Sequence, residues 1–147
     1  MTPQPAPSTL FPRGAIALIG LMFVPVAVQA TFFPRSFFDD FPLGRSWIAL
    51  TEGVYSEHLV RDVGALFLAL VIVSVWAWWE PALCLPLAVA WLVQGTLHFV
   101  YHVGHLDHFD GFDSVAMLFS LVTVPLLAVA VIVAEWRRRA PSRDALE

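Results

Sequence analysis

The sequence predicts an all-α integral membrane protein, an up-down bundle of four transmembrane helices. Apolar residues make up 59% of the 147 residues and charged residues 14%, whereas about 25% of a soluble domain is charged. A soluble protein of this length has too little interior to hide that much apolar surface. The apolar residues also gather in four continuous blocks, each close to the roughly 20 residues that cross a bilayer as a helix. A β-barrel would need alternating segments and more of them.

The four blocks belong to one domain and cover residues 14–33, 59–79, 81–103 and 114–136. Residues 1–13 are rich in proline and are expected to be unstructured, and residues 137–147 form a tail. The second and third blocks are separated by a very short turn, so we expect them to form an antiparallel pair. Val28-Gln29-Ala30 resembles a signal-peptidase site, which leaves open the removal of the first span.

Arginine placement predicts the orientation in the plasma membrane. Arg13 precedes the first span, and Arg137, Arg138, Arg139 and Arg143 follow the fourth. Because arginine and lysine concentrate on the cytoplasmic side, both termini are expected to be cytoplasmic. Five tryptophans near the span ends would act as interfacial anchors, namely Trp47, Trp76, Trp78, Trp79 and Trp136.

The outer loop between the first two spans is unusually aromatic. Phe37, Phe38, Phe41 and Trp47 are too apolar for a free aqueous loop. We expect this segment to lie along the outer membrane surface as an interfacial connector, or to fold over the bundle as a lid. Ser46 is a candidate N-cap for a short helix that runs to residue 55.

All five histidines lie in two segments that should meet. One is in the polar start of the second span, which carries Glu57, His58, Arg61 and Asp62. The second span enters the membrane from outside and the third returns there, so these segments share the outer leaflet. At about 100° per residue, one arc of about 100° on the third span holds Gln94, His98, Tyr101, His102 and His105. Ionisable groups at membrane depth are costly, so the two segments are expected to face each other.

The start of the second span also carries local signals. Glu57 and Arg61 are spaced i,i+4, as are His58 and Asp62, so each can form an ion pair along one helix. Gly64 would permit close approach of a neighbouring helix.

Three interpretations of the polar cluster stay open. In the first, His58, His98, His102 and His105 bind zinc, copper, iron or haem, because neutral imidazoles suit these metals. Glu57, Arg61, Asp62, Gln94 and Tyr101 would then complete the cofactor site or orient the ligands. In the second, the cluster carries or senses protons, because histidine titrates near neutral pH. In the third, the polar groups only hold the helices together.

The function that we expect from this pattern is binding of a transition metal or a metal-bearing redox cofactor. An accessory subunit of a membrane complex is the first alternative, and a proton-linked transporter or pH sensor the second; the chain could also form a homo-oligomer. An enzyme is less favoured, because no H-E-x-x-H, G-x-S-x-G or phosphate-loop motif is present. The composition excludes a nucleic-acid partner, and the single cysteine excludes an internal disulfide.

The pattern Glu57-His58-x-x-Arg61-Asp62-x-Gly64, the four spans and the aromatic loop resemble a group of small actinobacterial membrane proteins. This resemblance covers Phe33–Asp110. The layout is also broadly similar to the four-helix DoxX-like proteins, some of which are linked to quinone or redox chemistry. That similarity is architectural, because the histidine stripe is not a general mark of the superfamily, and it implies no particular activity.

Overall fold

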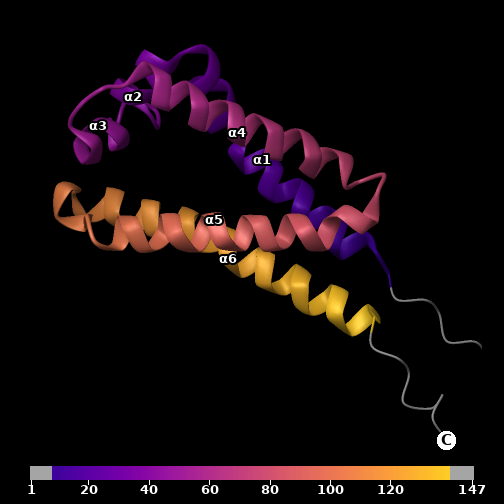
Figure 1. The fold of residues 1–147 in the computed structure, drawn as a ribbon. Coiled ribbons are helices and arrows are strands. Elements are labelled where there is room, and N and C mark those ends of the chain that lie inside the picture. The colour runs from indigo at the N-terminus through magenta and orange to yellow at the C-terminus, as the bar shows by residue number, and fades with distance from the viewer. Residues whose placement is uncertain (1–7, 140–147) are drawn as a thin grey trace, which may run out of the picture.

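The computed structural model describes residues 8–139, and this part of the chain contains helices and no strand (Figure 1). Four helices are long and apolar enough to cross a membrane, which indicates a multi-pass membrane protein in contact with lipid. They are α1 (Leu10–Phe32), α4 (Glu57–Trp76), α5 (Cys84–Val103) and α6 (Gly111–Arg139). Two short helices, α2 (Pro34–Asp40) and α3 (Trp47–Glu52), lie between α1 and α4, and 3-10 turns cover Pro81–Leu83 and Leu106–His108.

The outermost helices are longer than the sequence predicts. Helix α1 begins at Leu10, inside the stretch expected to be unstructured, of which residues 1–7 lie outside the described part of the chain. Helix α6 continues through Arg139, and Glu135 near its end forms ion pairs with Arg138 and Arg139. These i,i+3 and i,i+4 ion pairs stabilise the additional turn of the helix. The arginines also interact favourably with the C-terminal end of the helix dipole. The tail from residue 140 lies outside the described residues.

The long helices associate as two pairs. Helix α4 packs mainly on α1, and α5 mainly on α6, whereas α4 and α5 contact each other much less despite the short connection between them. A Cβ placed on Gly64 would lie 2.5 Å from the backbone nitrogen of Thr31. The close approach predicted at Gly64 is therefore confirmed, and α1 is the partner.

The two pairs are in contact at one end of the molecule and diverge toward the other (Figure 1). We call these the terminal end, where α1 begins and α6 ends, and the loop end, which carries residues 33–56 and 104–110. Near the terminal end, the core buries Ile16, Ile19, Trp91 and Val131. Within it, Trp91 Nε1 donates a hydrogen bond of 3.0 Å to Ser74 Oγ, which joins α5 to α4. The core therefore holds the pairs together at this end only.

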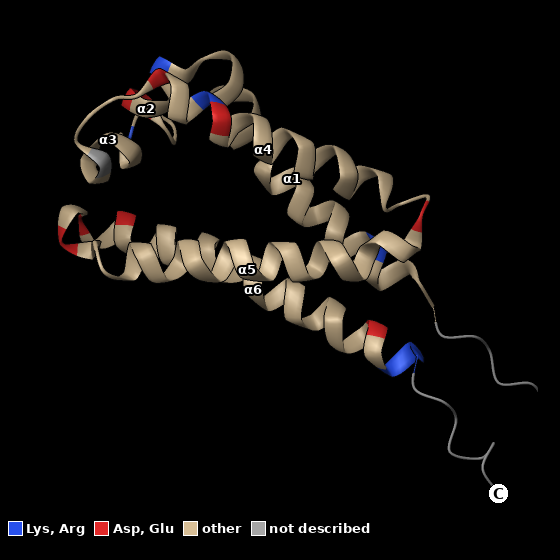
Figure 2. Ribbon diagram, in the orientation of Figure 1, with Lys and Arg blue, Asp and Glu red and all other residues tan. Residues whose placement is uncertain are grey.

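The charged side chains gather at the two ends of the described part of the molecule, and the middles of the long helices lack them (Figure 2). At the terminal end, Trp76, Trp79 and Trp136 are exposed. This distribution fits apolar helix middles in hydrocarbon, with charged and aromatic residues at the two interfaces.

The segment of residues 33–56, here called the cover segment, folds into α2 and α3. The short helix predicted after Ser46 is present, but it ends at Glu52 rather than at residue 55. The next residue, Gly53, adopts a φ of 68°, which does not continue the helix. Ser46 occupies the predicted N-cap position, but its side chain does not cap the helix. Its backbone has a φ of 58°, and its side chain makes no capping bond, because a capping residue needs an extended backbone to point its oxygen at the helix.

Candidate functional site

A cavity of about 680 Å³ lies between the two helix pairs toward the loop end. All four long helices and the cover segment contribute to its wall, which is mainly apolar. The apolar wall includes Phe23, Phe67 and Val124, and the polar side chains in it are Ser56, Gln94, His98, His102, Ser120 and the Trp47 indole. The volume falls within the roughly 300–1,000 Å³ of pockets that hold small molecules.

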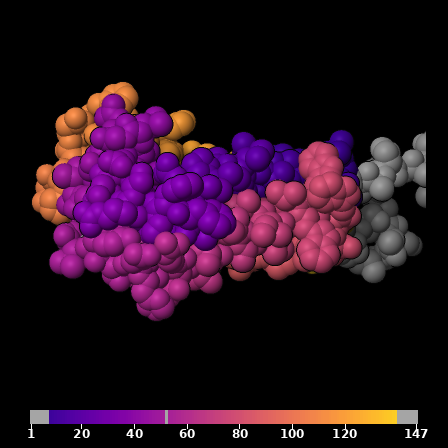
Figure 3. Space-filling view, turned by 90° about the horizontal axis from the view of Figure 1, so that it is seen from above, coloured from indigo at the N-terminus to yellow at the C-terminus, as the bar shows by residue number. Residues whose placement is uncertain are grey.

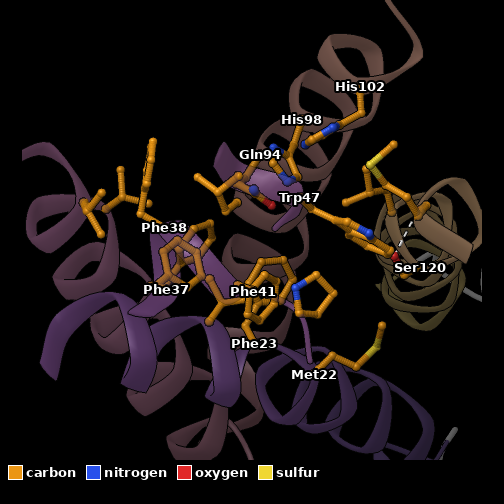
Figure 4. Close-up of a pocket in the computed structure, with 18 of the residues that line it drawn as sticks. Met22, Phe23, Phe37, Phe38, Phe41, Trp47, Gln94, His98, His102 and Ser120 are labelled. Carbon is orange, nitrogen blue, oxygen red and sulfur yellow. Dashed lines mark hydrogen bonds between the residues drawn. The ribbon is translucent and has the colours of Figure 1, made fainter. Parts of the chain in front are cut away.

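Helix α5 supplies the polar side of this cavity (Figure 4). Gln94, His98 and His102 are spaced i, i+4 and i+8, which places them along one face of the helix. The His98 and His102 rings lie edge to face with centroids 4.7 Å apart. His102 is only 6% exposed, and neither its Nδ1 nor Gln94 Oε1 has a hydrogen-bond partner.

Seen from above, the cover segment lies over the loop end of the molecule (Figure 3). Phe37 and Phe38 of α2 are buried and line the cavity together with Phe41, whose ring centroid lies 4.9 Å from that of Phe37. Trp47 of α3 also lines the wall, and its buried Nε1 has no hydrogen-bond acceptor. The aromatic residues of this segment therefore form part of the cavity wall.

A charged contact joins the cover segment to the second helix pair. Arg45 donates a hydrogen bond to the carboxylate of Asp113, in the first turn of α6, and its guanidinium lies 4.8 Å from the centre of the Phe112 ring. The Trp47 and Phe109 rings meet edge to face beside it, with centroids 6.2 Å apart. This contact, here called the Arg45–Asp113 bridge, connects residues 68 positions apart.

The predicted stripe on the third span divides into two groups. Gln94, His98 and His102 line the cavity, whereas Tyr101 and His105 are absent from its wall. Their rings stack with centroids 4.2 Å apart, and His105 Nδ1 donates a hydrogen bond of 2.7 Å to the Tyr101 carbonyl. Helix α5 ends at Val103, before His105, so His105 does not continue the helical spacing on which the stripe was predicted.

The polar start of α4 does not join the histidines of α5, contrary to the predicted packing. His58 is 91% exposed and pairs with Asp62 at 3.3 Å. Arg61 binds Glu57 at 2.8 Å and donates a 2.6 Å bond to the Thr31 carbonyl on α1. Both i,i+4 pairs are thus confirmed. The expected cross-contact is lost because the helix pairs diverge here and the cover segment lies between them.

Among residues 8–139, no group of three or more histidine, cysteine, aspartate or glutamate side chains is placed to hold a metal ion. Comparisons with protein-family models, curated proteins and solved structures found no match. The actinobacterial and DoxX-like resemblance, and binding of a metal or haem, therefore stay predictions of the sequence.

Two important parts of the site are missing from the sequence prediction. The sequence marks Trp47, Phe37 and Phe38 as unusual for a loop, but it does not indicate that they line a cavity. The Arg45–Asp113 bridge has no local signal in the sequence, because two membrane spans, α4 and α5, separate its residues along the chain. Long-range contacts of this kind follow only from the way the helix pairs and the cover segment pack together.

Proposed function

We propose that this protein is a membrane-embedded binding protein for a small, mainly apolar molecule. The observation that carries the proposal is the cavity of about 680 Å³, whose wall combines aromatic and aliphatic side chains with a few polar groups. Pockets with this combination are typical of small-molecule sites, because the apolar wall supplies affinity and the polar groups fix orientation.

The hydroxyl groups of the cavity wall favour binding over catalysis. Ser120, one of the hydroxyls in the wall, donates its hydrogen bond to the Met117 carbonyl at 2.8 Å, so no histidine accepts it as a base would (Figure 4). Nucleophilic catalysis needs such a base within hydrogen-bond distance. The polar groups of the wall are better suited to holding a molecule than to reacting with it.

The proposed setting is an up-down bundle in the plasma membrane, with the cavity toward the outer leaflet and both termini in the cytoplasm. Arg137, Arg138 and Arg139 lie at the terminal end, and α1 begins at the same end as α6 finishes (Figure 1). Both facts support one cytoplasmic end with the loop end outside. A molecule dissolved in the outer leaflet would then lie at the depth of the cavity.

Filling the cavity tests the proposal. Ala116 lines it, and Ala116→Phe would occupy space that a ligand needs. Ala69→Phe makes the same change at an exposed position on α4 and serves as the matched control. Nile red, an uncharged apolar dye, is titrated against each purified protein in the same detergent, with the thermal midpoint of unfolding measured to confirm that each variant is folded.

We expect the Ala69→Phe variant to bind Nile red like the wild type, and the Ala116→Phe variant to bind it at least tenfold more weakly. Equal binding by all three folded proteins would show that the dye partitions onto the apolar surface, and the proposal would fail.

A further inference from the structure

The polar atoms in the cavity wall are incompletely satisfied. Trp47 Nε1, Gln94 Oε1 and His102 Nδ1 are buried and have no hydrogen-bond partner, and all three side chains line the cavity. A buried polar atom without a partner costs roughly 1–3 kcal/mol. Three such atoms in one cavity indicate that a bound molecule, or water, completes their hydrogen bonds.

The cavity offers no charge to that molecule. Among the described residues that line it there is no lysine, arginine, aspartate or glutamate. The charged groups of the Arg45–Asp113 bridge are already paired with each other. Burial in this mainly apolar wall opposes charging of His98 and His102. An ionised carboxylate or phosphate would therefore lose its hydration without gaining a counter-ion, which is strongly unfavourable. The molecule is therefore uncharged.

To pair these atoms, the ligand must supply both a hydrogen-bond donor and a hydrogen-bond acceptor. The Trp47 indole N–H can only donate, and Gln94 Oε1 can only accept. A hydroxyl group does both, whereas a ketone, quinone or ester offers acceptors alone and would leave Gln94 Oε1 unpaired. The apolar remainder of the ligand has room beside Phe23, Phe67 and Val124, which line the same cavity.

We infer that the ligand is a lipophilic alcohol, bound with its hydroxyl between Trp47 and α5 and its apolar body along the deeper wall (Figure 4). This inference rests on the proposed function and specifies its ligand. The α5 side chains hold the polar group near the loop end, and the cover segment brings the indole to the same part of the wall.

The test compares three molecules that share one chain and differ in the head group: 1-tetradecanol, tetradecyl acetate and tetradecanoic acid. Each is used to displace Nile red from the wild-type protein in detergent at pH 7.5. We expect tetradecanol to displace the dye at about tenfold lower concentration than the acetate, since one hydrogen bond is lost with the ester. The acid should be the weakest of the three.

Two variants assign this preference to named atoms. Trp47→Phe removes the indole N–H, and Gln94→Leu removes the amide oxygen that accepts. Each variant places an uncharged, apolar side chain at the same position in the wall. Both should still bind Nile red. Gln94→Leu should no longer prefer the alcohol to the acetate, because only the alcohol donates to Gln94 Oε1. Trp47→Phe should need more of both competitors for displacement, because the alcohol and the ester each accept the indole hydrogen bond. If one variant does not fold, as its thermal midpoint will show, the other tests the inference alone.

The outcomes separate the inference from the proposed function. Equal displacement by alcohol and acetate, or stronger displacement by the acid, would overturn the inference; dye binding that is still sensitive to Ala116→Phe would then keep the proposed function. A preference for the alcohol that persists unchanged in folded Gln94→Leu would also overturn it, as would displacement from folded Trp47→Phe at the wild-type concentrations of alcohol and acetate. An affinity for Nile red that Ala116→Phe leaves unchanged would overturn the proposed function itself.

Discussion

Gly64 shows how a single hydrogen atom decides the packing of two membrane helices. A Cβ at this position would lie 2.5 Å from Thr31 N and 2.7 Å from the carbonyl carbon of Ala30. Both are backbone atoms, so they cannot rotate away as the end of a side chain could. Small residues at such contacts are typical of membrane helices, whose association depends on close packing rather than on the hydrophobic effect.

We therefore expect Gly64→Ala to lower the free energy of unfolding by about 1–3 kcal/mol, as overpacking commonly does. The matched control is Gly14→Ala, because nothing lies within 4 Å of a Cβ at Gly14. That change should be neutral or slightly stabilising, since alanine favours the helix more than glycine does. Thermal unfolding in detergent measures both, and equal midpoints would contradict the close contact between α1 and α4.

At the scale of elements, the Arg45–Asp113 bridge joins the cover segment to α6. The side chain of Asp113 is 12% exposed and that of Arg45 41%, so the carboxylate is mostly removed from water. Asp113 also lies in the first turn of α6, where a negative charge interacts favourably with the helix dipole. Removing Arg45 leaves this carboxylate without its partner, which costs more than the loss of an exposed ion pair.

We expect Arg45→Ala to lower the free energy of unfolding by about 2 kcal/mol. The double variant Arg45→Ala/Asp113→Ala should lose less than the sum of the two single changes. Arg35→Ala is the control within the same segment, since its pair with Asp39 is exposed and should contribute about 0–1 kcal/mol. Additive losses at positions 45 and 113 would show that the two side chains do not interact.

At the scale of the whole molecule, the cavity exists because the long helices of the two pairs share a packed core near the terminal end, whereas at the loop end the cover segment links the pairs. The core around Trp91 and the bond from Trp91 to Ser74 join the pairs near the terminal end. Toward the loop end the pairs diverge, and aromatic side chains of the cover segment occupy part of the space between them. The same arrangement leaves His58 at the surface.

The orientation of the molecule can be tested by cysteine labelling. Ser8 and Ser36 are exposed near opposite ends of α1, and each is changed to cysteine in a Cys84→Ala background. A membrane-impermeant maleimide should label Ser36→Cys on intact cells, and Ser8→Cys only after permeabilisation. Labelling of Ser8→Cys on intact cells would place the N-terminal end outside and reverse the proposed topology.

The sequence alone determines the features that depend on local interactions and on lipid. Long apolar blocks must form helices in a membrane, because only a helix satisfies its backbone hydrogen bonds within one segment. The four spans follow from this rule. The side-chain pairs Glu57–Arg61 and His58–Asp62 follow from helical spacing, and the contact at Gly64 follows from the absence of a side chain.

Only the tertiary structure decided which faces of the helices meet and what lies between them. The polar start of α4 and the histidines of α5 share one end of the molecule, yet α4 packs on α1 and α5 on α6. Residues at the same depth need not be in contact, because hydrophobicity sets depth while the fit of side chains on all four helices sets partners. For the same reason the sequence reveals His98 and His102, but not the cavity that they line.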